Sequence, residues 1–173
     1  MATRWLDDEE RALWMRLQAL SECLPPAVEA QLRKDAGLTR YEYYVLAVLS
    51  EAPTRSRLMA DLAAVTNGSL SRLSHAAAKL EANGWITRDY APGQRRSTVA
   101  TLTDAGWRKV VEAAPGHVTR VRELLFDRLT PEQTRALLDA IQPLFGPDAP
   151  HDPAHSSCGP DCEPDCDADC GRE

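Results

Sequence analysis

Hydrophobic residues recur at intervals of three and four positions along much of the chain, which is the spacing of helices with one buried face. The first such run begins after Asp7 and ends at Gly37, a common type of helix terminator. Its apolar positions are Leu13, Leu17, Leu20, Leu24, Val28 and Leu32. Pro25 and Pro26 fall inside the run, and proline lacks the backbone donor that a helix interior needs. We therefore expect a first helix over residues 7–37 that is interrupted at the two prolines.

Three shorter helices are predicted next. Thr39 and Glu42 have the spacing of a capping box and start a second helix, which ends before Pro53. A third helix is expected to open at Ser56, and a turn at residues 66–68 leads into a fourth helix over residues 69–83. The apolar positions of these helices are Tyr43, Val45, Leu46 and Leu49, then Leu58, Leu62 and Ala63, and finally Leu70, Leu73, Ala77 and Leu80.

The pattern then changes to that of short strands. Residues 85–89 and 98–102 are strand-like and are joined by a proline–glycine turn at residues 91–94, which predicts a β-hairpin. Thr103 caps a fifth, long helix, in which we expect a kink at Pro115 and Gly116.

The last predicted helix has a well-marked start. Thr130 is the cap, Pro131 occupies the first helical position and Gln133 the capping-box position. Its apolar residues, which we expect to face inward, are Leu137, Leu138, Ile141 and Leu144. Residues 147–173 are rich in proline and acidic residues and contain no large apolar residue, so they are expected to form a disordered tail.

The net charge of −6 is unevenly distributed. Residues 147–173 contain eight acidic residues and one basic residue, so the tail carries the acidity and the rest of the chain is close to neutral. Affinity for DNA depends on local basic patches, so the acidic composition does not exclude nucleic-acid binding. The sequence has no basic leader and no apolar run long enough to span a membrane, and we expect a cytoplasmic protein.

The predicted fourth helix carries a polar face suited to DNA. The residues expected on that face are Ser69, Ser71, Arg72, Ser74, His75 and Lys79. Guanidinium, imidazole and hydroxyl donors are the groups that read base edges and bind phosphates in a major groove. An ordinary solvated helix has a similar face, but here a short helix and a tight turn come before it and a basic hairpin comes after it. These neighbours favour a recognition helix.

Further basic residues flank this helix. Arg95 and Arg96 are expected at the tip of the hairpin beside Gly93, where an arginine pair can enter a narrow minor groove. Arg55 and Arg57, at the expected start of the third helix, are candidates for phosphate contacts. Helix and hairpin together predict a winged helix-turn-helix.

The sequence resembles the MarR family of bacterial winged-helix regulators over residues 5–146. The residues that carry the resemblance are Leu38-Thr39, Tyr43-Tyr44-Val45-Leu46, Leu58-Met59-Ala60-Asp61-Leu62-Ala63, Ser71-Arg72-Leu73-Ser74-His75, and Arg95-Arg96 followed by Leu102-Thr103-Asp104-Ala105-Gly106. Trp85 and the segment Pro115-Gly116-His117 resemble an actinobacterial branch of the family.

This resemblance implies a mainly α fold with a small β wing, in which six helices build an intertwined homodimer. The expected domains are an N-terminal dimerisation helix (1–37), a winged helix-turn-helix lobe (38–106), C-terminal dimerisation helices (107–146) and the acidic, cysteine-rich tail (147–173). The implied partner is double-stranded DNA with a pseudo-palindromic operator. An unknown small-molecule effector would bind in a crevice between the dimer helices and the DNA lobe.

The resemblance also assigns a role to the wing. Arg96 matches the arginine that enters the minor groove in this family, where an acidic residue usually stands two positions earlier. This chain has Gln94 at that position, so the carboxylate that usually orients the wing is missing.

Five cysteines fall into two groups. Cys23 stands alone in the first helix with no basic neighbour in sequence, and we expect a small buried thiol there. The other four, Cys158, Cys162, Cys166 and Cys170, recur every four residues in the tail, close to His151 and His155. Four thiolates suffice for tetrahedral zinc or another thiophilic metal, although the spacing differs from the Cys-x2-Cys pairs of structural zinc sites. Metal binding, reversible disulfides and an inert tail all stay open.

Two functional classes are compatible with these observations. The first is a sequence-specific DNA-binding transcriptional regulator, by family default a repressor, released by a small ligand, a metal or an oxidant. The alternative is a metal- or redox-handling protein that uses the winged helix as a protein-interaction module. An enzyme is not expected, because the sequence has no nucleophile elbow and no P-loop, and Ser74 and His75 are adjacent on a helix and point in different directions.

The tail hypothesis predicts a difference between the full chain and a truncation after Gly146. If the four tail cysteines sense a metal or an oxidant, DNA binding by the full chain changes on adding zinc or peroxide, whereas DNA binding by the truncated chain does not. A mobility-shift titration with and without each agent measures this. Identical responses of the two proteins would remove any sensing role for the tail.

Overall fold

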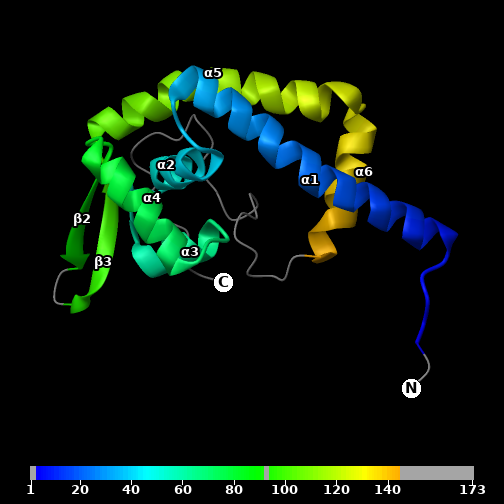
Figure 1. Ribbon diagram of the computed structural model, residues 1–173, viewed down its shortest axis with the longest axis horizontal. Helices are drawn as coiled ribbons and strands as arrows, with labels where there is room; N and C mark the ends of the chain where they lie inside the picture. Colours follow the sequence, from blue (N-terminus) through cyan, green and yellow to red (C-terminus); the bar gives the residue numbers. More distant parts are fainter. Residues whose placement is uncertain (1–2, 92–93, 145–173) are drawn as a thin grey trace, which may run out of the picture.

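The computed structural model describes residues 3–91 and 94–144, with the side chains of residues 91 and 94–96 excluded. Within these residues the chain forms a mainly α-helical protein with one small sheet (Figure 1). The helices are α1 (Asp8–Ala36), α2 (Arg40–Glu51), α3 (Met59–Val65), α4 (Leu70–Ala82), α5 (Asp104–Leu124) and α6 (Pro131–Ile141), and the strands are β1 (Ser56–Leu58), β2 (Ile86–Ala91) and β3 (Gln94–Leu102). Short 3-10 turns at Phe126–Arg128 and Gln142–Leu144 follow α5 and α6. The predicted fold, mainly α with a β wing, is confirmed.

The helix ends follow the signals in the sequence. Thr39 accepts a hydrogen bond from the amide of Glu42 while the Glu42 carboxylate accepts one from the amide of Thr39, which completes the predicted capping box of α2. Thr130 and Gln133 form the same box at α6. Gly37 ends α1 in the left-handed conformation, with φ of 67°.

The expected break in the first helix is wrong, because α1 runs unbroken through Pro25 and Pro26. These prolines leave the carbonyls of Ser21 and Glu22 without their usual amide partners. Both of those residues are exposed, so water can bond to the two carbonyls and the helix loses little. The long helix α5 is likewise continuous across Pro115.

The expected start of the third helix at Ser56 is also wrong. Residues Ser56–Leu58 form strand β1, which pairs antiparallel with β3, so the sheet has the order β1-β3-β2. Arg55 has a φ of 51°, which a right-handed helix does not allow, and its carbonyl accepts a hydrogen bond from the amide of Leu102. The hydroxyls of Ser56 and Thr101 meet across the two strands at 2.8 Å. The predicted hairpin is therefore the larger part of a three-stranded sheet.

The core lies where α2 meets the C-terminal half of α1, the first half of α5 and the helices of the lobe (Figure 1). Its largest fully buried side chains are Leu32, Leu38, Leu46, Leu49, Leu62, Leu73, Leu80 and Ile86. Leu70 was expected in the apolar stripe of α4, but its side chain is 57% exposed because it stands in the first turn, ahead of the buried part of the helix.

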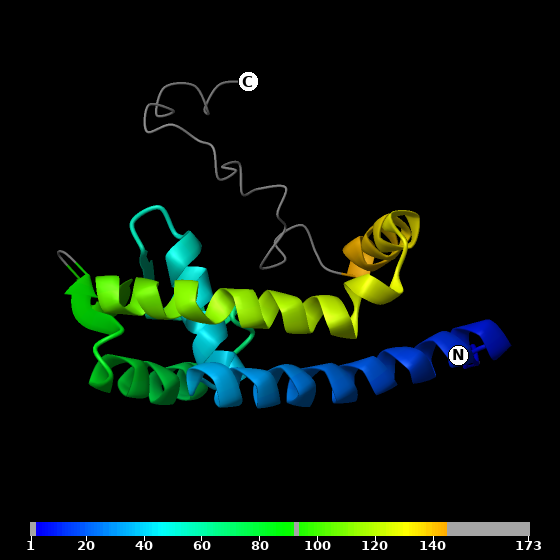
Figure 2. The ribbon, with the colours of Figure 1, turned by 90° about the horizontal axis from the view of Figure 1, so that it is seen from above.

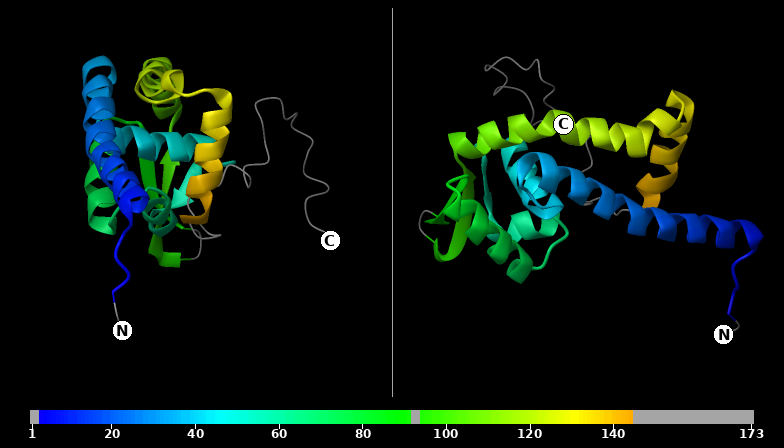
Figure 3. Two further views of the ribbon diagram at one scale, coloured as in Figure 1. Left: turned by 90° about the vertical axis from the view of Figure 1, so that its right-hand side faces the viewer. Right: turned by 45° about the horizontal axis from the view of Figure 1, so that its top comes forward.

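The part of the chain formed by α6 and the N-terminal half of α1 is largely exposed when one chain is considered alone. Helix α6 turns away at the far end of α5, and it contains no buried residue (Figures 2 and 3). The prediction that Leu137, Leu138, Ile141 and Leu144 face inward is therefore wrong for one chain, since α6 has no core to face. Cys23 is exposed on α1, so the expectation of a buried thiol is wrong as well. No helix in the described part of the chain is long and apolar enough to cross a membrane.

Two glycines of α5 provide a matched test of the packing. A Cβ on Gly106 would lie 2.1 Å from the carbonyl oxygen of Trp85, whereas a Cβ on Gly116 would meet only side chains, the amide of Gln31 at 3.0 Å and the carboxylate of Asp35 at 3.5 Å. We expect Gly106→Ala to lower the free energy of unfolding by about 1–3 kcal/mol, because backbone must move to admit the methyl group. Gly116→Ala should instead be neutral or stabilising by up to about 1 kcal/mol, since alanine favours helix. Urea unfolding of both variants measures the difference, and equal effects would contradict the packing described here.

Candidate DNA-binding site

Helix α4 presents one apolar face and one polar face. Leu73, Ala76, Ala77 and Leu80 pack into the core. The Ser69 hydroxyl caps the helix by accepting a hydrogen bond from the amide of Arg72, at 3.1 Å. The other predicted DNA-contacting residues of the helix are all exposed, namely Ser71, Arg72, Ser74, His75 and Lys79. The sequence therefore predicted the polar face of this helix correctly, whereas their contacts with DNA stay a prediction.

The turn before α4 packs against α2 through contacts with Tyr41. The Thr66 hydroxyl donates to the carbonyl of Leu62 at 2.7 Å and lies 3.0 Å from the hydroxyl of Tyr41. A Cβ on Gly68 would collide with that same Tyr41 hydroxyl, so a larger residue here would have to displace the buried Tyr41 side chain. Asn67 adopts a positive φ of 48°, which asparagine tolerates better than most residues. The angle between α3 and α4 is thus fixed by contacts with a third helix.

Tyr41 also supports the recognition arginine. The guanidinium of Arg72 lies over the Tyr41 ring, 4.1 Å from its centre, in a cation–π contact. The ring itself is buried, so it offers a fixed platform. Tyr41 was not among the predicted site residues, although an aromatic side chain in the first turn of a helix next to a predicted recognition helix was the available signal.

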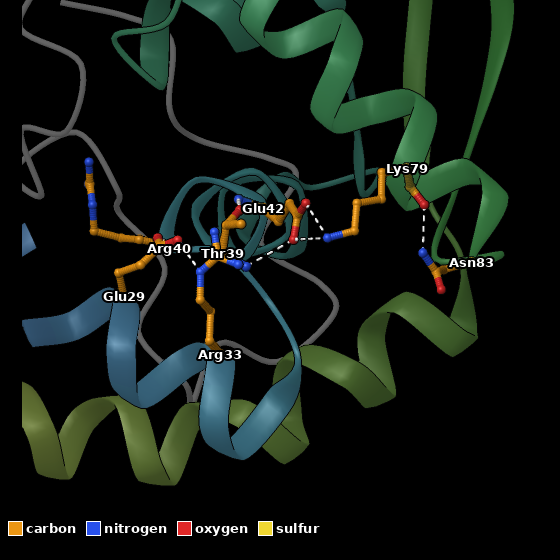
Figure 4. Close-up of polar contacts among 7 residues, drawn as sticks. All are labelled: Glu29, Arg33, Thr39, Arg40, Glu42, Lys79 and Asn83. Atoms are coloured by element: carbon orange, nitrogen blue, oxygen red, sulfur yellow. Dashed lines mark hydrogen bonds and ion pairs between the residues drawn. The ribbon is translucent and has the colours of Figure 1, made fainter. Parts of the chain in front are cut away.

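The side chain of Lys79 forms an ion pair with a residue of α2. Its ammonium is 2.8 Å from one carboxylate oxygen of Glu42, a residue of α2 that is almost fully buried (Figure 4). The side chain that was predicted to face DNA is therefore already paired with a carboxylate inside the protein.

The wing is the hairpin of β2 and β3, which stands beside α4 (Figure 3). It is longer than predicted, because pairing continues to Ala91 and Gln94. Arg95 and Arg96 therefore belong to strand β3, directly after the turn. The positions of the Gln94, Arg95 and Arg96 side chains lie outside the described residues, so insertion into a minor groove stays a prediction.

Two ion pairs hold the wing and the sheet in place. Arg88 of β2 binds Glu81 of α4 through two nitrogens, at 2.6 and 3.1 Å, and this bond lowers the pKa of the Glu81 carboxyl. Arg55 binds Asp104 at 3.2 Å and stacks on Trp107, so it braces β1 against α5. The prediction of Arg55 as a phosphate ligand overlooked both contacts. Arg57 lies in β1 with its Nε buried and without a hydrogen-bond partner.

A polar cluster, which consists of Gln31 of α1, Tyr43 of α2 and His117 of α5, lies where these helices meet, with Gln31 beside Gly116, the residue before His117. The ring of His117 packs against Tyr43 with 4.6 Å between ring centres, and burial lowers the pKa of the imidazole. The Nδ1 atom of His117 and the Oε1 atom of Gln31 are buried without hydrogen-bond partners in the protein. Such atoms favour a bound polar group or water at this place.

The predicted metal ligands, Cys158, Cys162, Cys166 and Cys170, lie outside the described residues. Among residues 3–91 and 94–144, no group of three or more metal-binding side chains comes together.

A short helix, a tight turn, a capped helix with an exposed polar face and a β-hairpin define a winged helix-turn-helix DNA-binding protein. A sequence model of the MarR family matches residues 36–97. Among solved structures, the chain is similar to Sco3205, a MarR family transcriptional regulator from Streptomyces coelicolor that was solved in complex with DNA. The two sequences are 40% identical, and the match covers 83% of this chain and 89% of that chain with a TM-score of 0.78. AbsC, another MarR family transcriptional regulator from Streptomyces coelicolor, is 35% identical with a TM-score of 0.76, over 82% and 95%.

No protein with a curated function matches the sequence significantly. The identity and coverage of the two solved relatives show that the chain belongs to the MarR family, and it is a DNA-binding transcriptional regulator.

The geometry of α4 generates a direct prediction for Arg72. We expect Arg72→Ala to weaken binding to the operator by about 1–3 kcal/mol, because it removes an exposed guanidinium from the polar face of α4. Arg11→Ala is the matched control, since it removes an exposed arginine near the far end of α1. Mobility-shift titrations at one salt concentration measure both. Unchanged affinity of Arg72→Ala would exclude α4 as the reading helix.

Proposed function

We propose that the chain is a cytoplasmic, non-enzymatic repressor that binds a pseudo-palindromic operator as a homodimer and leaves it when a small effector binds. The observation that carries this proposal is the exposed polar face of α4 beside the wing, in a chain that is 40% identical to a regulator solved in complex with DNA. In each subunit α4 enters a major groove, with Ser71, Arg72 and His75 at the bases or phosphates. Arg95 and Arg96 of the wing reach the neighbouring minor groove.

The homodimer is supported by apolar surface that one chain leaves open. Large hydrophobic side chains are exposed on α1, α5, α6 and the 3-10 turn after α6, namely Leu13, Trp14, Met15 and Leu20, then Val111 and Val118, then Leu137 and Leu138, and finally Leu144. Large apolar side chains exposed in this number favour an interface with a second chain. It also explains α6, since an isolated helix of eleven residues is marginal in water unless a partner covers its apolar face. These exposed apolar residues lie outside the DNA-binding lobe, and this supports the expected domains, in which residues 1–37 and 107–146 form the dimer and residues 38–106 read DNA.

Effector binding is supported by the polar cluster of Gln31, Tyr43 and His117. It offers two buried atoms without hydrogen-bond partners in the protein, the Oε1 acceptor of Gln31 and the Nδ1 atom of His117, whose ring packs against Tyr43. A small aromatic compound with a hydroxyl or carboxyl group suits such a lining. The cluster touches α1, α2 and α5 together, so a ligand there changes how the dimer helices meet the DNA lobe.

Selection of bound DNA from a random pool tests the proposed function. We expect the enriched sequences to contain two inverted half-sites with centres about one helical turn apart. Sedimentation of the free protein and of its complex should give two chains per operator. A pool without enrichment, or enrichment of a single half-site bound by one chain, would contradict the proposal.

The enriched operator then allows a screen for release. Small phenolic acids, thiophilic metals and oxidants are added to the complex, and release is followed by fluorescence anisotropy. If the effector binds at the polar cluster, His117→Phe binds the operator as the original protein does but responds at least tenfold more weakly, since one ring nitrogen is lost. Equal responses of the two proteins would place effector binding elsewhere.

A further inference from the structure

The recognition helix is held by an almost fully buried carboxylate that no DNA-binding role explains. The side chain of Glu42 is 7% exposed and accepts hydrogen bonds from two donors. One carboxylate oxygen lies 2.9 Å from the amide of Thr39 and 3.1 Å from the ammonium of Lys79, and the other lies 2.8 Å from that ammonium (Figure 4). Lys79 thus lies along the surface of its own helix toward α2.

Burial decides which partner Lys79 keeps. A charged carboxylate out of water needs a cation or several hydrogen bonds, and removing one partner from a buried pair is costly. If Lys79 turned to a DNA phosphate, Glu42 would keep only the Thr39 amide. A phosphate contact at the protein surface gains much less, because water and salt screen it. The balance therefore favours the Glu42 pair in the free protein and in the complex.

The position of Lys79 on the helix points the same way. The N-terminal residues of a recognition helix contact base edges, and Lys79 lies in the last turn of α4. It stands seven residues after Arg72, which is roughly 10 Å along the helix axis. Arg72 rests on Tyr41 and Lys79 binds Glu42, so two neighbouring residues of α2 hold α4 at two separated points. A single contact would fix only one point of α4, whereas these two separated contacts also fix the direction of its axis.

We infer that Glu42 is a positioning residue for DNA reading and that Lys79 acts through Glu42, not through a phosphate. The pair fixes the direction of α4 relative to α2, and so the angle at which Ser71, Arg72 and His75 enter the groove. This inference rests on the proposed DNA-reading role of α4. It replaces the prediction of Lys79 as a direct DNA contact.

The test compares four variants on the selected operator and on random DNA over a range of salt concentrations. Lys79→Met and Glu42→Gln each remove one charge, and the glutamine keeps an oxygen that can accept from Thr39. The double variant measures their coupling, and Lys79→Arg retains the pair. Urea unfolding identifies any variant that fails to fold.

For a positioning pair, each single charge-removing variant binds the operator about three- to thirtyfold more weakly, and the double variant binds no more weakly than either single one. Affinity for random DNA and the slope of log affinity against log salt stay unchanged, because no phosphate contact is lost. Lys79→Arg recovers operator binding. A purely structural role would not lower the ratio of operator affinity to random-DNA affinity.

The opposite results overturn the inference. If Lys79 contacts a phosphate, Lys79→Met reduces the salt slope by about one and weakens binding to both DNAs alike. Glu42→Gln then tightens binding, since it frees the ammonium. Unchanged operator binding in all variants would show an ordinary ion pair without a role in reading. The failure of the proposed function itself is separate, because in that case Arg72→Ala also keeps full affinity.

Discussion

The burial of helix α2 is the constraint on which the rest of the structure depends. Seven of its twelve residues are buried, and it contacts α1, α3, α4, α5 and β3 (Figure 1). Its aliphatic side chains, Val45, Leu46, Val48 and Leu49, supply the centre of the core. Its first turn performs a different task, because Tyr41 and Glu42 hold the recognition helix. The same helix therefore stabilises the fold and sets the geometry of the DNA-binding surface.

Sequence reasoning succeeded where the determinants are local. Caps such as Thr39 and Thr130, the terminator Gly37 and the polar face of α4 depend on residues a few positions apart, and each was found where it was expected. It failed where distant segments decide. Strand β1 exists because β3 lies beside it, and the helix through Pro25 persists because the freed carbonyls face water.

The DNA-binding site shows the same division. The residues of the recognition helix follow from its periodicity, but the partners that hold them do not. Lys79 meets Glu42 across 37 positions of sequence, and Arg55 meets Asp104 across 49. An exposed basic residue and a basic residue bound to a buried carboxylate look alike in a sequence pattern. Only the folded chain distinguishes a side chain that is free for phosphate from one that is committed to the protein.

The unbroken helix α1 has a mechanical consequence. Its buried residues, Val28, Leu32 and Ala36, all lie in the C-terminal part, so the stretch from Asp8 to Leu24, roughly 26 Å long, is left for the partner of the proposed dimer to cover. This stretch and the anchored C-terminal part are one continuous helix, so a change in how the partner binds the first would alter the direction of the second. A displacement of about 5 Å at its N-terminal end would correspond to a rotation of roughly ten degrees, given this length. Glu29, in the anchored part, accepts a hydrogen bond from the amide of Arg40 at 2.6 Å, and Arg40 begins α2 (Figure 4). The continuous helix and this hydrogen bond thus connect the part of α1 that one chain leaves exposed to the helix that holds α4.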